Sequence, residues 1–377
     1  MIIGGAQENT LDTVIELGKN KNYEVQLFSG YTSGPEGSLI SKAVSNCTLK
    51  ISKFLIRDIN PIMDFIALIQ LYFFIKKNKF DIVHTHSSKA GILGRFAAKL
   101  AKTPIIIHTV HGLPFFKAQN KILNKIYLLL EKITARFTHK IICVSPSLIE
   151  DAVSAGVGKR EKFVSVYSGI ELEKFKKNVR EKQTLRKKLG FSEHDIVIGN
   201  LSRLFTHKGH EFLLQAAKII MQKYPKTKLL LIGDGILRNK LKILAGNLRI
   251  EKNIVFTGLI VPGKVPQYLQ IIDILMHTSL HEGLPRAAVQ AFALEIPVIG
   301  FDIDGTRDVI KNNVNGFLIA PKNVAGLAAA ALKLMENRKL AQRMGKQGAD
   351  FVRDVFNLKT MIASIDFIYQ DLRLCGK

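Results

Sequence analysis

Short apolar runs alternate along this chain with longer segments of helical periodicity, in two separate series. The apolar runs predict strands at 23–28, 81–84, 105–108, 140–144 and 163–166 in the first series, and at 196–199, 228–232, 253–256, 274–276 and 297–300 in the second. The segments between them predict helices at 89–101, 119–137, 209–223, 236–247, 264–271, 285–294 and 324–335. Because such alternation builds right-handed βαβ units, each series predicts a doubly wound α/β domain around a parallel sheet.

A chain of 377 residues is long enough for two such domains. A Lys- and Glu-rich stretch at 171–190 separates the two series and predicts an exposed linker followed by a helix. We expect an N-terminal domain at 1–175, a second domain at 176–355, and a C-terminal helix at 356–377 that packs back toward the first domain. Open α/β sheets bind ligands at the carboxyl ends of their strands, so the expected binding site is a cleft between two facing domains.

The formal net charge of +24 indicates an anionic partner, which could be nucleic acid, anionic lipid or a phosphorylated substrate. A lysine-rich surface that only keeps the protein soluble is an equally good explanation of the charge alone. Three widely separated cysteines without metal-type spacing indicate a reducing cytosol as the setting: Cys47, Cys143 and Cys375.

The most apolar segment, at 62–75, is shorter than the roughly 20 apolar residues that a membrane span requires. It also contains Asp64 and Gln70 and is followed by Lys76 and Lys77. The segment therefore predicts a buried helix.

Three features of the second series could carry chemistry. Arg203 follows a predicted strand and Lys208 precedes a predicted helix, a combination that suits a diphosphate but also occurs in ordinary loops of basic proteins. The glycines of Gly233-Asp234-Gly235 allow a close backbone approach, although no dinucleotide-binding fingerprint follows, and a tight turn explains them. Glu282 opens the segment Glu282-Gly283-Leu284-Pro285 before a helix, where a carboxylate can accept from sugar hydroxyls or simply cap the helix.

Taken in order, these motifs closely resemble glycosyltransferase family 4, whose members are retaining, nucleotide-sugar-dependent enzymes of the GT-B fold. The matching segments of the second half are Arg203…Lys208, Gly233-Asp234-Gly235, Phe256-Thr257-Gly258, and Glu282-Gly283-Leu284-Pro285…Pro297-Val298-Ile299. Those of the first half are Gly4-Gly5-Ala6-Gln7, His84-Thr85-His86-Ser87, His108-Thr109-Val110-His111-Gly112 and Ser168-Gly169-Ile170. The resemblance covers nearly the whole chain and implies two Rossmann-like domains.

The resemblance implies roles for the matching residues. It implies that His111 and Glu282 are catalytic, with His111 near the transferred sugar and Glu282 in contact with it. The implied donor-binding residues are Arg203, Lys208, Gly258, Gly283, Leu284, Pro285 and Gln290, with the first two on the diphosphate. The loop of Gly4, Gly5 and Gln7 is implied to lie near the donor phosphate and the acceptor.

Two features differ from the family pattern. Gln290 stands where the family has a second glutamate that contacts the nucleotide ribose; an amide can still donate and accept hydrogen bonds there, but it carries no charge. Asp302 and Asp304 form an Asp-x-Asp pair, but two carboxylates are a thin ligand set, and the resemblance implies no metal and no other cofactor. The histidines at the strand ends of the first series lack strong metal spacing and are explained as hydrogen-bonded residues, with His111 the best candidate for a functional one.

Residues 117–140 predict a basic amphipathic helix. On a helical wheel Lys117, Lys121, Lys125, Lys132, Arg136 and Lys140 fall on one side, and Ile122, Ile126, Leu130, Ile133 and Phe137 cluster beside them. Such a helix is typical of proteins that bind an anionic membrane surface, and also of a packed helix with a solvated lysine face. Both explanations stay open.

We therefore expect a retaining glycosyltransferase that moves a sugar from a nucleotide-diphosphate sugar to a hydroxyl acceptor, a glycan or a lipid-linked sugar, in polysaccharide or glycolipid synthesis. The expected location is the cytoplasm, with peripheral attachment to the inner face of the cell membrane as an extension. An epimerase or phosphorylase of the same fold is an alternative. A nucleic-acid-binding protein is another, against which stands the lack of any recognised nucleic-acid motif.

The N-terminus departs from the usual order of a strand before a glycine loop. Only Met1, Ile2 and Ile3 precede Gly4, too few for a strand of about five residues. The sequence predicts a first domain without its first strand, with an exposed sheet edge and a mobile glycine loop.

Overall fold

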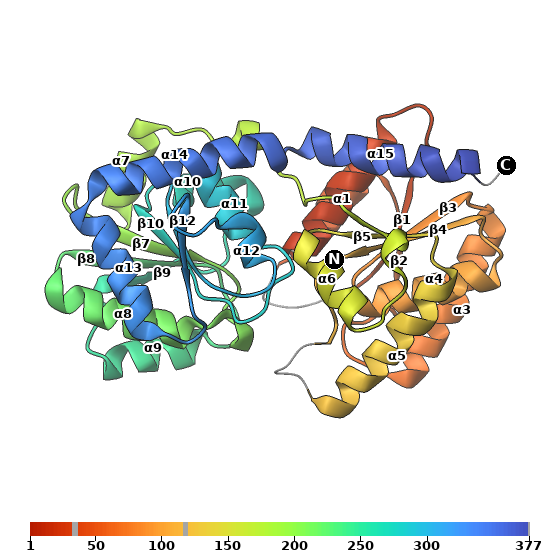
Figure 1. Ribbon diagram of the computed structural model, residues 1–377, viewed down its shortest axis with the longest axis horizontal. Coiled ribbons are helices and arrows are strands. Elements are labelled where there is room, and N and C mark those ends of the chain that lie inside the picture. The colour runs from red at the N-terminus through yellow and green to blue at the C-terminus, as the bar shows by residue number, and fades with distance from the viewer. Residues whose placement is uncertain (32–36, 116–119, 376–377) are drawn as a thin grey trace. The chain divides into compact units, whose positions relative to one another are not determined.

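The computed structural model describes residues 1–31, 37–115 and 120–375. The chain divides into two compact units, unit 1 with Met1–Gly169 and Lys359–Lys377, and unit 2 with Ile170–Leu358. The sequence-based division differs by six residues at the first boundary and three at the second. Both units are Rossmann-like, with helices packed on parallel sheets (Figure 1).

Unit 2 is built on one sheet of six parallel strands in the order β12-β11-β10-β7-β8-β9. The strands are β7 (Ile196–Leu201), β8 (Thr227–Ile232), β9 (Ile254–Phe256), β10 (Ile274–His277), β11 (Val298–Phe301) and β12 (Gly316–Ile319). The α-helices are α7 (Val179–Lys188), α8 (His210–Lys223), α9 (Arg238–Asn247), α10 (Val265–Leu269), α11 (Arg286–Ala293), α12 (Thr306–Val309), α13 (Val324–Glu336) and α14 (Arg338–Val355). Short 3₁₀ turns lie at Leu172–Lys174, Thr206–Lys208, Glu251–Asn253 and Pro262–Lys264.

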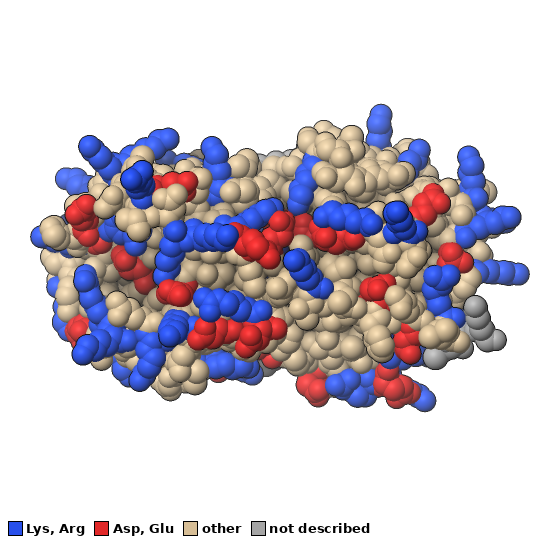
Figure 2. Space-filling view, turned by 90° about the horizontal axis from the view of Figure 1, so that it is seen from above, with Lys and Arg blue, Asp and Glu red and all other residues tan. Residues whose placement is uncertain are grey.

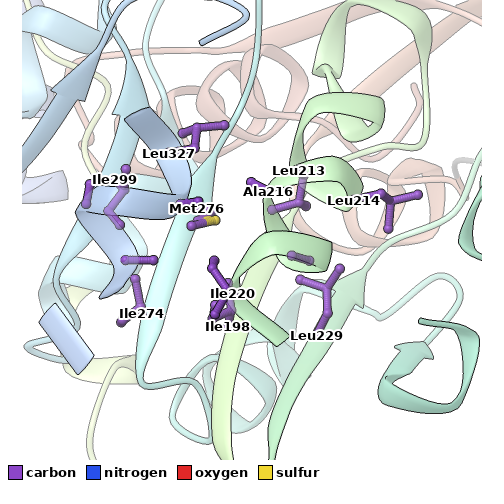
Figure 3. Close-up of a cluster of buried hydrophobic side chains, with 14 of the residues drawn as sticks. Ile198, Leu213, Leu214, Ala216, Ile220, Leu229, Ile274, Met276, Ile299 and Leu327 are labelled. Carbon is purple, nitrogen blue, oxygen red and sulfur yellow. The ribbon is translucent and has the colours of Figure 1, made fainter. Parts of the chain in front are cut away.

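The core of unit 2 lies between this sheet and helices α8 and α13. Ile198 of β7, Leu229 of β8 and Met276 of β10 meet Leu213 of α8 and Leu327 of α13 (Figure 3). All five are at most 1% exposed. Burying such a side chain contributes about 1.5–3 kcal/mol, so this cluster holds the strand ends above it in fixed positions.

Unit 1 contains two separate parallel sheets. One pairs β1 (Gln26–Gly30) with β2 (Thr48–Ser52), and the other has the order β3-β4-β5-β6, formed by β3 (Ile82–His86), β4 (Ile105–Val110), β5 (Lys140–Cys143) and β6 (Phe163–Ser165). Within the described residues no strand joins β1 to β3. Met1 and Ile2 are buried, and Ile2 forms a single antiparallel bridge with Ser38.

The helices of unit 1 are α1 (Gly5–Gly18), α2 (Ile40–Asn46), α3 (Pro61–Asn78), α4 (Ser88–Leu100), α5 (Lys121–Phe137), α6 (Pro146–Ser154) and α15 (Leu358–Cys375), with a 3₁₀ turn at Arg160–Lys162. Asparagine starts several of the helices in the chain by accepting a hydrogen bond from a backbone N–H of the first turn, as in α3, α5, α7, α13 and α14. The C-terminal helix α15 belongs to unit 1, where Asp366 bonds Tyr23 and Met361 bonds Asn9.

Several local expectations were wrong or incomplete. The segment 62–75 is helical, but it is not a buried helix, because α3 exposes Ile62, Phe65 and Phe73 by more than 60%. The strands β2 and β12 and the helices α2, α6, α12 and α14 had no counterpart in the sequence-based assignment. Of the basic helix expected at 117–140, α5 covers 121–137, and 117–119 lie outside the described residues.

Candidate active site

The strand order of the unit 2 sheet reverses at β7, because the next strands, β8 and β9, lie on one side of it and β10 lies on the other. Loops that leave the carboxyl ends of two such strands diverge, and ligands of open α/β sheets bind in the crevice they leave. Arg203 and Lys208 follow β7, and Glu282 follows β10. The topology thus brings these three predicted residues to one edge of one sheet.

A charged cluster occupies this edge. The Lys208 ammonium and the Glu282 carboxylate form an ion pair in which both side chains are less than one-fifth exposed. The imidazole Nε2 of buried His277, the last residue of β10, lies 3.3 Å from the same carboxylate oxygen. Burial by itself would raise the pKa of Glu282, but Lys208 and His277 outweigh it and hold the pKa well below its usual range. The cluster therefore presents a carboxylate that stays ionised at neutral pH beside an ammonium group.

Arg203 lies in the loop between β7 and the Thr206–Lys208 turn. Its guanidinium carbon lies 5.1 Å from the ring centre of Phe205, a cation–π contact that limits the side chain's freedom. The loop rests on Gly233, where a Cβ would come within 2.2 Å of the Ser202 carbonyl oxygen. The glycine here has φ of 134°, so both the close approach and the backbone conformation exclude a side chain.

The segment Gly283-Leu284-Pro285 is buried and leads directly into α11. Its position depends on Gly305, where a Cβ would lie 1.9 Å from the Gly283 carbonyl oxygen. Gln290 lies about one turn into α11 and is partly exposed.

Gly258 follows β9 in the left-handed conformation, with φ of 73°. It forms an isolated bridge with Gly233, and an added Cβ would lie 3.2 Å from the guanidinium of Arg238. Arg238 is itself paired with Asp234 at 2.7 Å. Gly258 therefore lies beside the glycine turn after β8.

The Asp-x-Asp pair is engaged within the protein. Asp302 pairs with Arg307 at 2.5 Å, and Asp304 pairs with Nδ1 of His281 at 2.8 Å. No group of three His, Cys, Asp or Glu side chains converges as a metal-ligand set anywhere in the described ranges. The Asp304–His281 contact fixes the residue next to Glu282.

Histidines gather at the strand ends of unit 1. The rings of His84 and His86 stack at 4.4 Å between centres, and those of His86 and His111 at 5.3 Å. His86 Nδ1 lies 3.0 Å from His111 Nε2, and His84 is held on both nitrogens, by the Tyr369 hydroxyl at 2.6 Å and the Thr109 hydroxyl at 2.7 Å. His84, His86 and His111 together form the histidine row, in which His86 orients the ring of His111.

Burial lowers the pKa of three of these neighbouring histidines. It lowers the pKa of His86 to about 4 and the pKa of His84 and of His108 well below the usual range, and the positive charge of Arg95 adds to the effect at His108. At neutral pH these rings are therefore neutral hydrogen-bonding groups.

The predicted glycine loop forms the start of a helix. Gly4 precedes α1, Gly5 is its first residue, and Gln7 lies in its first turn. An added Cβ on Gly4 would lie 2.9 Å from Oε1 of Gln7. Two residues on, buried Asn9 donates to the Ser168 hydroxyl at 2.8 Å, which ties α1 to the segment after β6.

Three residues of these clusters had no place in the predicted site: His277, Asp304 and Tyr369. His277 could have been found, because it ends a strand next to the loop that carries Glu282. Asp304 was considered only as a metal ligand. Tyr369 lies 285 residues from His84 in the sequence, and no local pattern indicates their contact.

Comparisons with known proteins agree with this arrangement. Residues 181–351 match the family described as Glycosyl transferases group 1, and residues 3–174 match Glycosyltransferase Family 4. Over 374 residues the chain is 30% identical to a UDP-Gal:alpha-D-GlcNAc-diphosphoundecaprenol alpha-1,3-galactosyltransferase of Escherichia coli, with 98% of this chain and 95% of that protein covered. The chain belongs to glycosyltransferase family 4.

Other relatives of this family 4 glycosyltransferase carry related names. It is 26% identical over 317 residues to the capsular polysaccharide biosynthesis glycosyltransferase CapM of Staphylococcus aureus, covering 83% of this chain and 82% of that protein. The fold of Anabaena Alr3699/HepE, solved with UDP-glucose, matches with a TM-score of 0.84 at 20% identity, covering 98% and 96% of the two chains. The glycosyltransferase thus has the GT-B fold. In the part of the chain that the structure describes, no helix has the length and hydropathy of a membrane span.

Proposed function

We propose that this glycosyltransferase transfers a hexose from a UDP-sugar, with retention of configuration, to a hydroxyl group of a lipid-linked glycan. The observation that carries the proposal is the Lys208–Glu282–His277 cluster, which lies where the strand order of the unit 2 sheet reverses. The Escherichia coli relative is named for a UDP-galactose donor, an acceptor on diphosphoundecaprenol and an alpha linkage, and those words support both the donor and the acceptor class.

In the proposed reaction, a bond forms between the acceptor oxygen and the sugar's anomeric carbon while the bond to the donor phosphate breaks. The acceptor's proton passes to an oxygen of the leaving diphosphate, on the same face of the sugar. Arg203 and Lys208 stabilise the charge that develops on that diphosphate. The Lys208 ammonium has three N–H donors, so it can keep Glu282 while it binds phosphate.

Glu282 is proposed to accept hydrogen bonds from hydroxyls of the donor sugar. Its low pKa keeps it an acceptor across the neutral range. Gln290 is proposed to contact the ribose through its amide. In unit 1, we propose that His111, aligned by His86, provides a hydrogen-bonding group for the sugar, and that the start of α1 at Gly4, Gly5 and Gln7 serves the acceptor. No bound metal is required by this scheme, and full activity in excess chelator is the expected result.

Peripheral attachment to the inner face of the cell membrane is part of the proposal, because a lipid-linked acceptor stays at the bilayer surface. The basic helix α5 supplies an electrostatic contribution to it. On the face of the molecule that Figure 2 draws, Lys and Arg side chains are spread widely, with Asp and Glu among them. The net charge alone therefore does not define the membrane-binding surface.

A transfer assay tests the proposed function. The enzyme is incubated with UDP-galactose, UDP-glucose or UDP-N-acetylglucosamine and a short-chain lipid diphosphate sugar, and the anomeric configuration of the product is read by NMR. An alpha-linked product and free UDP are expected. Donor consumption that requires inorganic phosphate would instead indicate a phosphorylase, and interconversion of sugars without an acceptor an epimerase.

A further inference from the structure

Helix α3 has apolar side chains on both its buried and its exposed face. Ala67, Leu71 and Ile75 face the interior and are at most 7% exposed. The opposite side carries the α3 apolar row, which consists of Ile62 (71% exposed), Phe65 (62%), Ile69 (39%) and Phe73 (61%). An amphipathic helix on a protein surface normally turns polar side chains to water. An exposed apolar row of this kind therefore indicates a surface that binds a partner or a membrane.

Helix α5 exposes apolar side chains as well. Its buried residues are Glu131, Thr134 and Ala135, whereas Ile122, Ile126 and Leu129, the α5 apolar row, are 50–70% exposed. Of the two explanations left open for this helix, an apolar face packed against the protein does not hold for its first half. In the second half of the helix, Glu131 turns inward and pairs with fully buried Arg95 of α4 at 2.8 Å.

The two rows belong to neighbouring helices. Helix α4 packs against both α3 and α5, and the three lie side by side in Figure 1. Asp64 of α3 also raises the pKa of Tyr127 of α5, after burial, which is the larger cause. The rows thus form parts of one surface of unit 1.

The charge around the rows has one sign. The only carboxylates on α3 and α5 are Asp64 and Glu131, and each is in an ion pair, with Lys89 and Arg95 respectively. Exposed cations accompany the rows: Lys76, Lys77, Lys121, Lys125 and Arg136. A partner must therefore accept apolar side chains and neutralise several ammonium groups at once.

We propose that the α3 and α5 apolar rows insert into the headgroup region of an anionic lipid bilayer, with the flanking lysines on the lipid phosphates. Bilayers satisfy both requirements, because hydrocarbon accepts apolar side chains of any shape and anionic headgroups attract lysines. This inference extends the proposed function, on which it rests for its purpose of reaching a lipid-linked acceptor. It adds α3 to the basic helix and makes apolar insertion a required part of the attachment.

Vesicle flotation tests the proposal without an activity measurement. The full chain is mixed with vesicles of phosphatidylcholine alone or of phosphatidylcholine with phosphatidylglycerol, and the floated fraction gives the partition coefficient. The paired change Phe65→Gln and Phe73→Gln is expected to weaken binding to the mixed vesicles by about tenfold, because two phenyl rings no longer leave water. The matched control is Phe367→Gln, an equally exposed phenylalanine (69%) on α15, which is expected to leave partitioning unchanged.

A second pair of variants tests the electrostatic part. Lys125→Gln is expected to reduce binding to anionic vesicles by about fivefold, and Lys21→Gln, an exposed lysine after α1, by less than twofold. Equal partitioning to neutral and anionic vesicles, or equal effects of Phe65/Phe73 and Phe367, would overturn the proposal. So would a dimer in light scattering that the Phe65/Phe73 pair disperses, since the rows would then be covered by a second copy.

The outcome is separable from that of the transfer reaction. Turnover of a short-chain, water-soluble acceptor without vesicles is expected to be the same in the wild type and the Phe65/Phe73 variant. Vesicle binding without any transfer would refute the proposed function and leave the membrane surface standing. Transfer of sugar without vesicle binding would support the proposed function and refute the membrane surface.

Discussion

The two units follow one construction rule and present different chemistry at their strand ends. Unit 2 has a continuous six-stranded sheet whose edge carries the Lys208–Glu282 ion pair. Unit 1 has two separate sheets, and its strand ends carry histidines such as His84 and His86, whose lowered pKa values keep them neutral. Permanent cations suit a diphosphate, whereas neutral rings suit sugar hydroxyls. On the proposed function, the diphosphate charge is bound by unit 2, and the histidines of unit 1 add hydrogen bonds to the sugar.

Removing the lysine of the charged cluster is the strongest test of this division. In Lys208→Ala the donor diphosphate loses an ammonium and Glu282 loses its ion pair, so kcat/KM is expected to fall by about 100- to 1000-fold. The control Lys240→Ala changes an exposed lysine of α9 and is expected to leave kcat/KM within twofold. Steady-state kinetics over UDP-sugar concentration measures both. Near-wild-type turnover in Lys208→Ala would remove the diphosphate site from this position.

A glycine pair tests whether the sheet edge of unit 2 is held by close backbone contact. The Cβ of Gly305→Ala would collide with the Gly283 carbonyl oxygen, so a loss of about 2–3 kcal/mol of unfolding free energy is expected. Gly246→Ala is the matched control, because nothing lies within 4 Å of its Cβ inside α9, and a gain of up to about 1 kcal/mol is expected. Urea titration measures both; similar midpoints for the two variants would show that the contact is dispensable.

Acid should affect unit 1 before the charged cluster of unit 2. The pKa values of His84, His86 and His108 lie below the ordinary 6.5 in the folded state, so their full contribution to stability is present above pH 6.5. As pH falls below that value, these histidines bind protons in the unfolded chain but not yet in the folded chain. The free energy of unfolding therefore drops by on the order of 1 kcal/mol per histidine. The lowered pKa of Glu282 keeps its contribution intact until pH falls below about 4.5.

Hydrogen exchange at about pH 7 and about pH 5 locates this effect. Peptides from β3 and β4 are expected to lose more protection than those from β7 and β10, although burial also lowers the pKa of two histidines in unit 2, His207 and His210, the latter to about 4. Equal losses in the two units would contradict the assignment of the acid sensitivity to the histidine row.

The smallest expected effect concerns orientation within the histidine row. His86→Ala removes the ring that lies 3.0 Å from His111 Nε2, so kcat is expected to fall by about tenfold, through His111, while KM for the donor changes less than twofold. His86→Gln keeps a hydrogen-bonding group and should recover part of kcat. A fall in donor affinity instead of kcat would indicate that His86 acts on unit 2 chemistry or on folding.

The sequence placed most strands and helices because apolar periodicity is a local property. The strands β4, β5 and β8 were located to within one or two residues for that reason. Strand β2 carries the polar residues Thr48, Lys50 and Ser52, so it lacks a clear apolar run, whereas β12 offers only the three apolar residues 317–319 after Gly316. The motif residues Arg203, Lys208 and Glu282 could also be named from the sequence, because each follows a predicted strand at a short distance along the chain.

The tertiary structure alone decided three further matters. It brought Lys208 to Glu282, 74 residues away, and Tyr369 to His84, because strand order rather than sequence distance determines which loops meet. It turned one apolar side of α3 to the solvent, which periodicity could not reveal in a helix that is apolar on every side. The sequence by itself determined the fold class, the family and the residues at the strand ends; packing determined which of them touch and which apolar surfaces stay open to a partner.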